Sequence, residues 1–176
     1  FTGVTGDGTL QVSVDTGSDV QDGAGNALAS SATSEEVGID HTGPVTTVTA
    51  QVTSDTTPTV TGTVTDASGV ASVSVIVDGR TYTATVTGTT WSVEVTNALT
   101  PGTYNVQARG TDILGNTGAY DATTGELIVD LTVPTVTVNP LLTSDPTPTV
   151  TGTATIGAGF TISGVEVTVN GQTYSA

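Results

Sequence analysis

The chain has 176 residues, 35% of them hydrophobic, which is enough for the core of one or two ordinary domains. Its 17 acidic residues against two basic ones give a formal net charge of -15, which argues against a nucleic-acid partner and makes a cation the natural counter-charge. There is no cysteine, and no apolar stretch approaches the roughly 18 residues of a spanning helix, so we expect no disulfide, no thiolate metal site and no membrane insertion.

Thr and Val dominate the chain, whereas the residues that favour helices are scarce. Because β-branched side chains lose rotamer freedom in a helix and fit a pleated surface, this composition predicts an all-β protein.

In the middle of the chain, apolar and polar residues alternate with a period of two at residues 59–65, 73–77, 91–95 and 104–108. Gly-rich turn signals lie between and after them, as at Asp78-Gly79 and Leu114-Gly-Asn116. About seven short strands in fewer than a hundred residues predict a β-sandwich. Its predicted core contains Val60, Val64, Val73, Val75, Val77, Trp91, Val93, Val95, Tyr104, Val106, Leu127 and Val129. Tyr104 is expected to form a corner bond to the backbone, whereas Leu10 takes its place in the first 41 residues.

A repeat of 90 residues runs through the chain. Thr53-Ser-Asp-Thr-Thr-Pro-Thr-Val-Thr-Gly-Thr63 recurs from Thr143 with one substitution, and Asp22-Gly-Ala-Gly-Asn26 corresponds to Asp112-Ile-Leu-Gly-Asn116. Self-similarity at a fixed period indicates an array. We therefore predict tandem immunoglobulin-like sandwiches: the second half of one unit (1–41), a complete unit (44–130) and the first half of a third (134–176).

These motifs, with the Gly-Thr-Tyr corner and the Asp-Xaa-Xaa-Xaa-Pro junction, resemble the bacterial Ig-like repeats of large type I-secreted adhesins of Gram-negative bacteria. The resemblance covers nearly the whole chain. It implies an extracellular, cell-surface stalk stiffened by Ca²⁺ at the junctions between repeats, with the adhesion ligand bound elsewhere.

Acidic residues gather at the expected junctions. In an Ig-like sandwich, the loops after the second and sixth strands lie at the pole where the preceding unit joins, which brings Asp66, Asp112 and Asn116 near Asp40. Hard oxygen donors suit Ca²⁺, so we hypothesise a calcium site there. The alternative is that these residues only bond the backbone of their own turns. At the second junction Ile156 replaces Asp66, so a site near Asp130 would need Asp55 or Asp145.

Nothing in the sequence indicates catalysis. His41 is the lone histidine and lies in a linker, and Glu35-Glu36 are adjacent, so on a strand they would point to opposite faces. Without lysine, Lys-Asn isopeptide crosslinks are impossible.

We therefore expect a non-enzymatic structural repeat that extends and stiffens an adhesin or surface filament. The alternative is a module that binds glycan, ice or a partner chain through exposed loops or rows of threonine, which are also simply good residues for exposed strands. These rows comprise Thr59, Thr61, Thr63 and Thr65, and Thr81, Thr83, Thr85 and Thr87. The half-units also predict strand complementation, either with neighbouring repeats or with other copies of the chain.

Overall fold

The computed structural model describes residues 5–157 and 160–176, which contain 17 strands and no helix. The chain forms two compact units, Phe1–Val129 and Asp130–Ala176. Within the first unit we distinguish the N-terminal segment (residues 5–41) from the central domain (residues 44–129); the second unit is the C-terminal segment. No described residue belongs to a helix able to cross a membrane.

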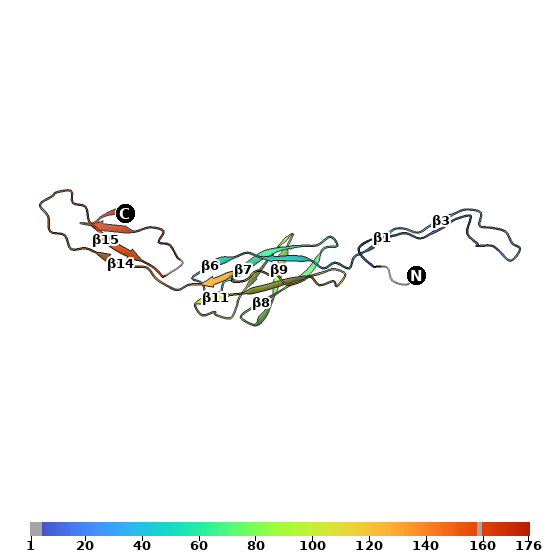
Figure 1. The fold of residues 1–176 in the computed structure, drawn as a ribbon, viewed down its shortest axis with the longest axis horizontal. Helices are drawn as coiled ribbons and strands as arrows, with labels where there is room; N and C mark the ends of the chain where they lie inside the picture. The colour runs from blue at the N-terminus through green and yellow to red at the C-terminus, as the bar shows by residue number, and fades with distance from the viewer. Residues whose placement is uncertain (1–4, 158–159) are drawn as a thin grey trace. The chain divides into compact units, whose positions relative to one another are not determined.

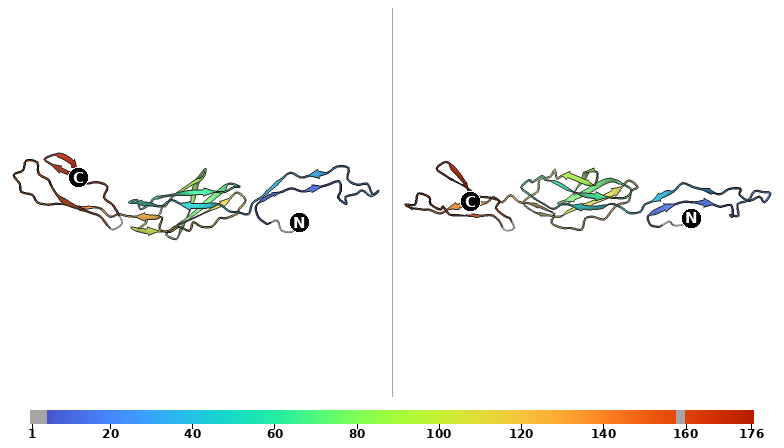
Figure 2. Two further views of the ribbon diagram at one scale, coloured as in Figure 1. Left: turned by 45° about the horizontal axis from the view of Figure 1, so that its top comes forward. Right: turned by 90° about the horizontal axis from the view of Figure 1, so that it is seen from above.

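The N-terminal segment consists of short paired strands (Figures 1 and 2). These strands are β1 (Gly8–Leu10), β2 (Ser13–Val14), β3 (Ala32–Thr33) and β4 (Val37–Ile39). β1 pairs antiparallel with β4, and β2 with β3. Most of their side chains are exposed, because the described part of this segment provides no second layer over them.

The central domain has nine strands (Figure 1). They are β5 (Val45–Val48), β6 (Gln51–Thr53), β7 (Thr59–Thr65), β8 (Val70–Val77), β9 (Arg80–Thr87), β10 (Thr90–Glu94), β11 (Gly102–Tyr104), β12 (Val106–Asp112) and β13 (Leu127–Val129). The sequence predicts about seven because β5 and β6, and β11 and β12, follow each other after breaks of one or two residues.

These strands form a sandwich, as predicted. One sheet has the order β12-β8-β9-β10-β7-β5 and the other β11-β13-β6, in which β13 and β6 run parallel. β9 connects the two halves of the large sheet. Its residues 80–84 pair with β8, and its residues 85–87 pair with β10. Strands from both halves of the large sheet, and β13 of the small sheet, contribute residues to one core.

The observed core contains ten of the twelve predicted residues. Val93 and Tyr104 are instead partly buried and pack against its edge, because they lie near sheet margins. Ala84, Leu99 and Ala108 are buried although the sequence analysis did not select them. The Tyr104 corner is confirmed, since its hydroxyl donates to the Thr100 carbonyl at 2.7 Å.

The indole side chain of Trp91 packs over Gly62, its partner in β7. Its indole N–H lies 3.0 Å from the Thr47 carbonyl oxygen and 3.2 Å from that of Thr63, so it joins β5 and β7. A Cβ at position 62 would lie 1.9 Å from the Thr47 oxygen and 2.5 Å from the indole. Only glycine therefore allows the indole and both strands to meet here.

The C-terminal segment has two separate hairpin-like pairs. β14 (Thr135–Val138) pairs with β15 (Gly152–Thr155), and β16 (Glu166–Val169) pairs with β17 (Gln172–Ser175).

We predict that Gly62→Ala lowers the free energy of unfolding of the central domain by at least about 2 kcal/mol, because overpacking forces the β5–β7 pair or the indole to move. Denaturant unfolding followed by the fluorescence of Trp91, the single tryptophan, measures this directly. Gly102→Ala is the control, since its added Cβ meets only the Tyr104 ring at 3.9 Å and should cost less than about 0.5 kcal/mol. Equal stability of both variants would contradict the packing argument.

Candidate metal centre

The turn after β12 is organised by the side chain of Asp112. Its Oδ1 accepts hydrogen bonds from the backbone N–H groups of Leu114 at 2.9 Å and Asn116 at 2.7 Å. Its Oδ2 accepts one from the Asn116 side-chain amide at 2.8 Å. Gly115 has a φ of 94°, which a side chain would strain. The turn-stabilising role that the sequence allowed for Asp112 is therefore present.

Asn116 links this turn to the preceding segment. The same amide nitrogen that bonds Asp112 also donates to the backbone carbonyl of Asp40 at 3.0 Å. Asn116 thus acts as a donor that fixes the junction, whereas the sequence analysis selected it as an oxygen ligand.

The carboxylate of Asp66 lies beside that of Asp112. Its Oδ1 accepts hydrogen bonds from the Ser68 N–H at 2.9 Å and from the Ser68 hydroxyl at 2.6 Å. The hydroxyl is also 3.3 Å from Asp112 Oδ2, so Ser68 bridges the two acidic residues.

Asp40, Asp66 and Asp112 form one acidic group. One carboxylate oxygen of each lies within 4.8 Å of the others; Asp112 is buried and the other two are half-buried. Asp40 Oδ1 accepts from the Thr42 N–H at 2.9 Å, whereas its Oδ2 is buried without a hydrogen-bond partner among the described residues. The group therefore has an unused acceptor inside it.

Asp7 lies next to this group without belonging to it, and the sequence analysis missed it. Its carboxylate accepts hydrogen bonds from the His41 N–H at 2.7 Å and from the Thr42 hydroxyl. It lines a shallow pocket together with Asp40 and Asp66. Asp7 could have been predicted only from the pairing of β1 with β4. Gly8 lies opposite Ile39 in this pair, which places Asp7 next to Asp40.

Hydrogen bonds favour the charged state of two of these carboxylates, Asp112 and Asp7. Desolvation acts to raise the pKa of Asp112, but the bonds from the Asn116 side chain and from the turn N–H groups outweigh it and lower the pKa below its usual value. Bonds from the Thr42 hydroxyl and the His41 N–H likewise lower the pKa of Asp7. The two arginines are engaged elsewhere: Arg80 lies in β9, and Arg109 stacks on Tyr120 with its guanidinium 4.6 Å from the ring centre.

The residues selected for the second junction show a different arrangement. Asp55, Asp130 and Asp145 each cap their own turn, accepting from the N–H groups of Thr57, Thr132 and Thr147 at 2.8 Å. None belongs to the group of three acidic side chains found in the described part of the chain.

The residues considered for catalysis occupy structural positions. His41 Nδ1 lies 3.2 Å from the Gly6 carbonyl oxygen. Glu35 and Glu36 are exposed between β3 and β4, not on a strand as the sequence analysis assumed.

Comparison with known families identifies the scaffold. Residues 39–131 match the family described as bacterial Ig-like domain. The chain belongs to this family. No curated protein matches the chain. Asp40, Asp66 and Asp112 all lie within the matched residues, so the acidic group belongs to the bacterial Ig-like domain. Bacterial Ig-like domains are generally non-catalytic and commonly occur at the cell surface.

We predict that the central domain loses stability as the pH falls below about 4, because a carboxyl whose pKa is lower in the folded than in the unfolded state binds its proton more weakly when folded. Its contribution is complete above the unfolded pKa and disappears as the pH falls through the folded one. Asp112→Asn should lower stability at pH 7 and flatten this acid dependence.

Chemical unfolding at a series of pH values, read by Trp91 fluorescence, provides the measurement. Asp78→Asn is the control, since Asp78 is exposed in the β8–β9 turn and asparagine tolerates its φ of 49°. If the free energy of unfolding of Asp112→Asn falls with pH as steeply as that of the parent chain, Asp112 is not a source of the acid dependence.

Proposed function

We propose that this bacterial Ig-like chain is a non-enzymatic spacer that extends and stiffens an extracellular adhesin or surface filament. The observation that supports it is the junction, which is hydrogen-bonded from both sides. Asp7 of the N-terminal segment binds His41 and Thr42, and Asn116 of the central domain binds Asp40.

The end of the linker is also packed into the central domain. Pro44 is fully buried, and a Cβ at Gly110 would lie 2.7 Å from its ring. A Cβ at Gly43 would lie 2.4 Å from the backbone of Gly118. Close backbone packing and a fixed proline φ leave the linker little freedom, which is what a stiff spacer requires.

The large type I-secreted adhesins supply the biological setting of the proposal, through the repeated junction and turn motifs. In such an array each sandwich is a spacer, and stability adds up between neighbours. The repeat organisation 1–41, 44–130 and 134–176 is part of this proposal.

Calcium at the junction is the finer part of the proposal. Asp40, Asp66 and Asp112 would hold the ion: their oxygens lie within 4.8 Å of one another, and the buried Asp40 Oδ2 has no described partner. Oxygen ligands with several negative charges suit Ca²⁺. The ion would offset the repulsion between the carboxylate of Asp40 and those of Asp66 and Asp112 in the central domain. We do not extend the site to Asp55, Asp130 or Asp145, because none of them lies in the group of three neighbouring carboxylates found in the described part of the chain.

A second candidate function is binding through the threonine rows. Thr61, Thr63, Thr85 and Thr87 line a shallow pocket beside Trp91. This function ranks lower because the hydroxyls bond each other within the sheet, as Thr47 and Thr63 do at 2.6 Å.

We predict that Asp7→Ala makes the junction more flexible, because His41 and Thr42 lose their acceptor. Since the chain has no cysteine, spin labels placed through Ser30→Cys and Thr83→Cys report the distance between the N-terminal segment and the central domain. The distance distribution should broaden in Asp7→Ala. Asp15→Ala is the control, since Asp15 lies outside the junction. A broad distribution already present in the parent chain would contradict the stiff spacer.

We predict that millimolar Ca²⁺ raises the melting temperature of the central domain relative to chelator, since a hundredfold excess over Kd adds about 2.7 kcal/mol to the free energy of unfolding. Thermal melts followed by circular dichroism measure the shift. Asp66→Asn should abolish it, because asparagine keeps the Oδ1 acceptor for Ser68 but removes the charge.

Asp55→Asn is the matched control, since Asp55 Oδ1 caps Thr57 as Asp66 Oδ1 caps Ser68, outside the acidic group. It should retain the calcium shift. If the parent chain shows no shift, the carboxylates serve the turns alone and the spacer acts without calcium.

A further inference from the structure

Tension along the chain reaches the central domain through one strand and leaves it through another. The chain enters the domain at Pro44 and β5, and it leaves the domain after β13. β6 follows β5 after only two residues, so a pull on the preceding segment reaches β6 from its N-terminal end. A pull on the segment that follows reaches β13 from its C-terminal end.

β6 and β13 lie side by side and run parallel, with Val52 opposite Ile128. In a parallel pair, the N-terminal end of one strand and the C-terminal end of the other lie at opposite ends of the pair. Tension along the chain therefore slides β6 and β13 past each other. It loads the hydrogen bonds between them together, instead of opening them one after another.

The β6–β13 pair gives this force a path that avoids the apolar core. None of the hydrophobic core residues lies in β5 or β6, and Val52 of β6 is 58% exposed. β13 does contribute Leu127 and Val129 to the core, but it receives the force from β6 through backbone hydrogen bonds at its edge. Force can therefore cross the domain before any core residue has to move.

Both ways of extending the domain break this pair. If the domain yields from its N-terminal side, β5 leaves β7, and β6 must then leave β13. If it yields from its C-terminal side, β13 must leave β6 and β11, and Leu127 and Val129 must leave the core. The β6–β13 pair is the contact that both routes share.

Glu126 holds the start of β13 in place. Its backbone oxygen accepts a hydrogen bond from the Gln51 N–H of β6 at 2.7 Å, and its Oε2 accepts one from the Val106 N–H of β12 at 3.0 Å. Glu126 is only 4% exposed, and hydrogen bonds shielded from water are stronger than exposed ones. Sliding of β13 has to break both of these bonds.

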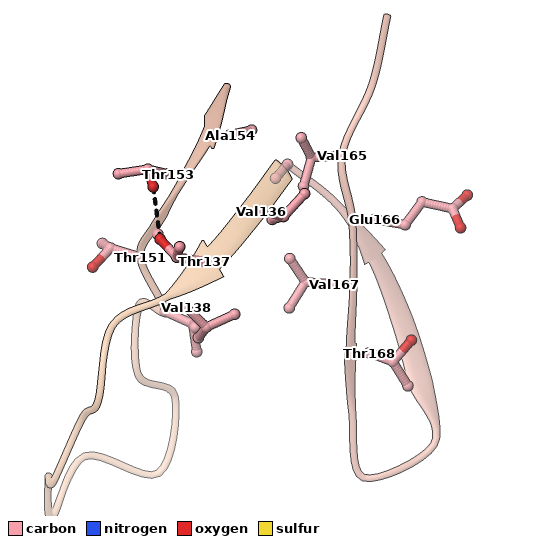
Figure 3. A pocket seen from close by; sticks show the side chains of 13 residues that line it. Val136, Thr137, Val138, Thr151, Thr153, Ala154, Val165, Glu166, Val167 and Thr168 are labelled. Atoms are coloured by element: carbon pink, nitrogen blue, oxygen red, sulfur yellow. Dashed lines mark hydrogen bonds between the residues drawn. The ribbon is translucent and has the colours of Figure 1, made fainter. Parts of the chain in front are cut away.

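The strand through which tension enters is bound in the same way in the next copy of the 90-residue repeat. β14 pairs with β15 as β5 pairs with β7. The hydroxyls of Thr137 and Thr153 lie 2.6 Å apart, as do those of Thr47 and Thr63 (Figure 3). The anchoring of the entering strand is therefore a feature of the repeat and not of one copy.

We propose that the β6–β13 pair carries tension across the central domain in shear, so that the domain resists being pulled open along the chain. This property belongs to the sandwich alone. It depends neither on the spacer function nor on calcium at the junction, and the experiment below tests it independently of both.

Single-molecule force spectroscopy of the 1–176 chain in chelator tests the proposal. Because the chain has no cysteine, handles attached through Ser30→Cys and Ser144→Cys apply the pull on either side of the central domain. Unfolding of residues 44–129 is recognised by the release of up to about 30 nm of chain, at roughly 3.5 Å per residue.

Gln51→Pro removes the N–H that binds Glu126. The unfolding rate at constant force should rise about fivefold, which is the effect of losing one hydrogen bond. Val52→Pro is the matched control. Because backbone N–H groups alternate between the two edges of a strand, the Val52 N–H faces away from β13, and this variant should unfold at nearly the rate of the parent chain.

Val73→Ala distinguishes a force-bearing contact from a general loss of stability. Val73 lies in β8 and is 1% exposed, so its truncation should lower the denaturant concentration at which the domain unfolds. Under force its unfolding rate should stay close to that of the parent chain, because the β6–β13 pair breaks before the core opens.

Trp91 fluorescence verifies that every variant is folded before it is pulled. If Gln51→Pro does not fold, Thr53→Pro takes its place, since the Thr53 N–H faces the same edge of β6 as that of Gln51. An unchanged unfolding rate of this variant under force would overturn the proposal. Equal acceleration by Val52→Pro would do so as well, because strain from proline would then explain the effect. Equal acceleration by Val73→Ala would show that tension passes through the core.

Discussion

A strand with valine on one side and threonine on the other is stable only when a second layer covers the valine face. In the central domain this condition is met: β7, β8, β10, β12 and β13 bury their apolar residues in one core, and Trp91 joins β5 to β7 across Gly62. The same pattern in the two flanking segments leaves valines exposed, because the described part of each segment does not cover them with a complete second layer.

The junction is held by hydrogen bonds in addition to the burial of Pro44. Asn116 binds Asp112 in its own turn and the Asp40 backbone in the linker, so a turn that stabilises the sandwich also holds the preceding segment. Asp7 binds the linker from the other side. N–H and O–H donors lower the pKa of Asp7 and of Asp112, so protonation of these two carboxyls at low pH is expected to weaken the junction.

The residues of the acidic group were accessible from the sequence to different degrees. Asp66 and Asp112 follow or end strands at one pole, and the repeat places Asp40 at the preceding boundary, so topology alone brings them near each other. Asp7 required the β1–β4 register, which short exposed strands specify weakly. The role of Asn116 as a donor depended on its side-chain orientation. No spacing rule predicts that orientation.

Alternation with a period of two and a repeat of 90 residues determined the all-β fold, the strand positions and ten of the core residues, because these depend on local patterning that every copy shares. The tertiary structure decided which strands pair, including the parallel β13–β6 pair, the passage of β9 between the two sides of the large sheet and the burial of Ala84, Leu99 and Ala108. These features depend on contacts between residues far apart in the sequence, and small residues such as alanine become buried only when a neighbouring layer covers them.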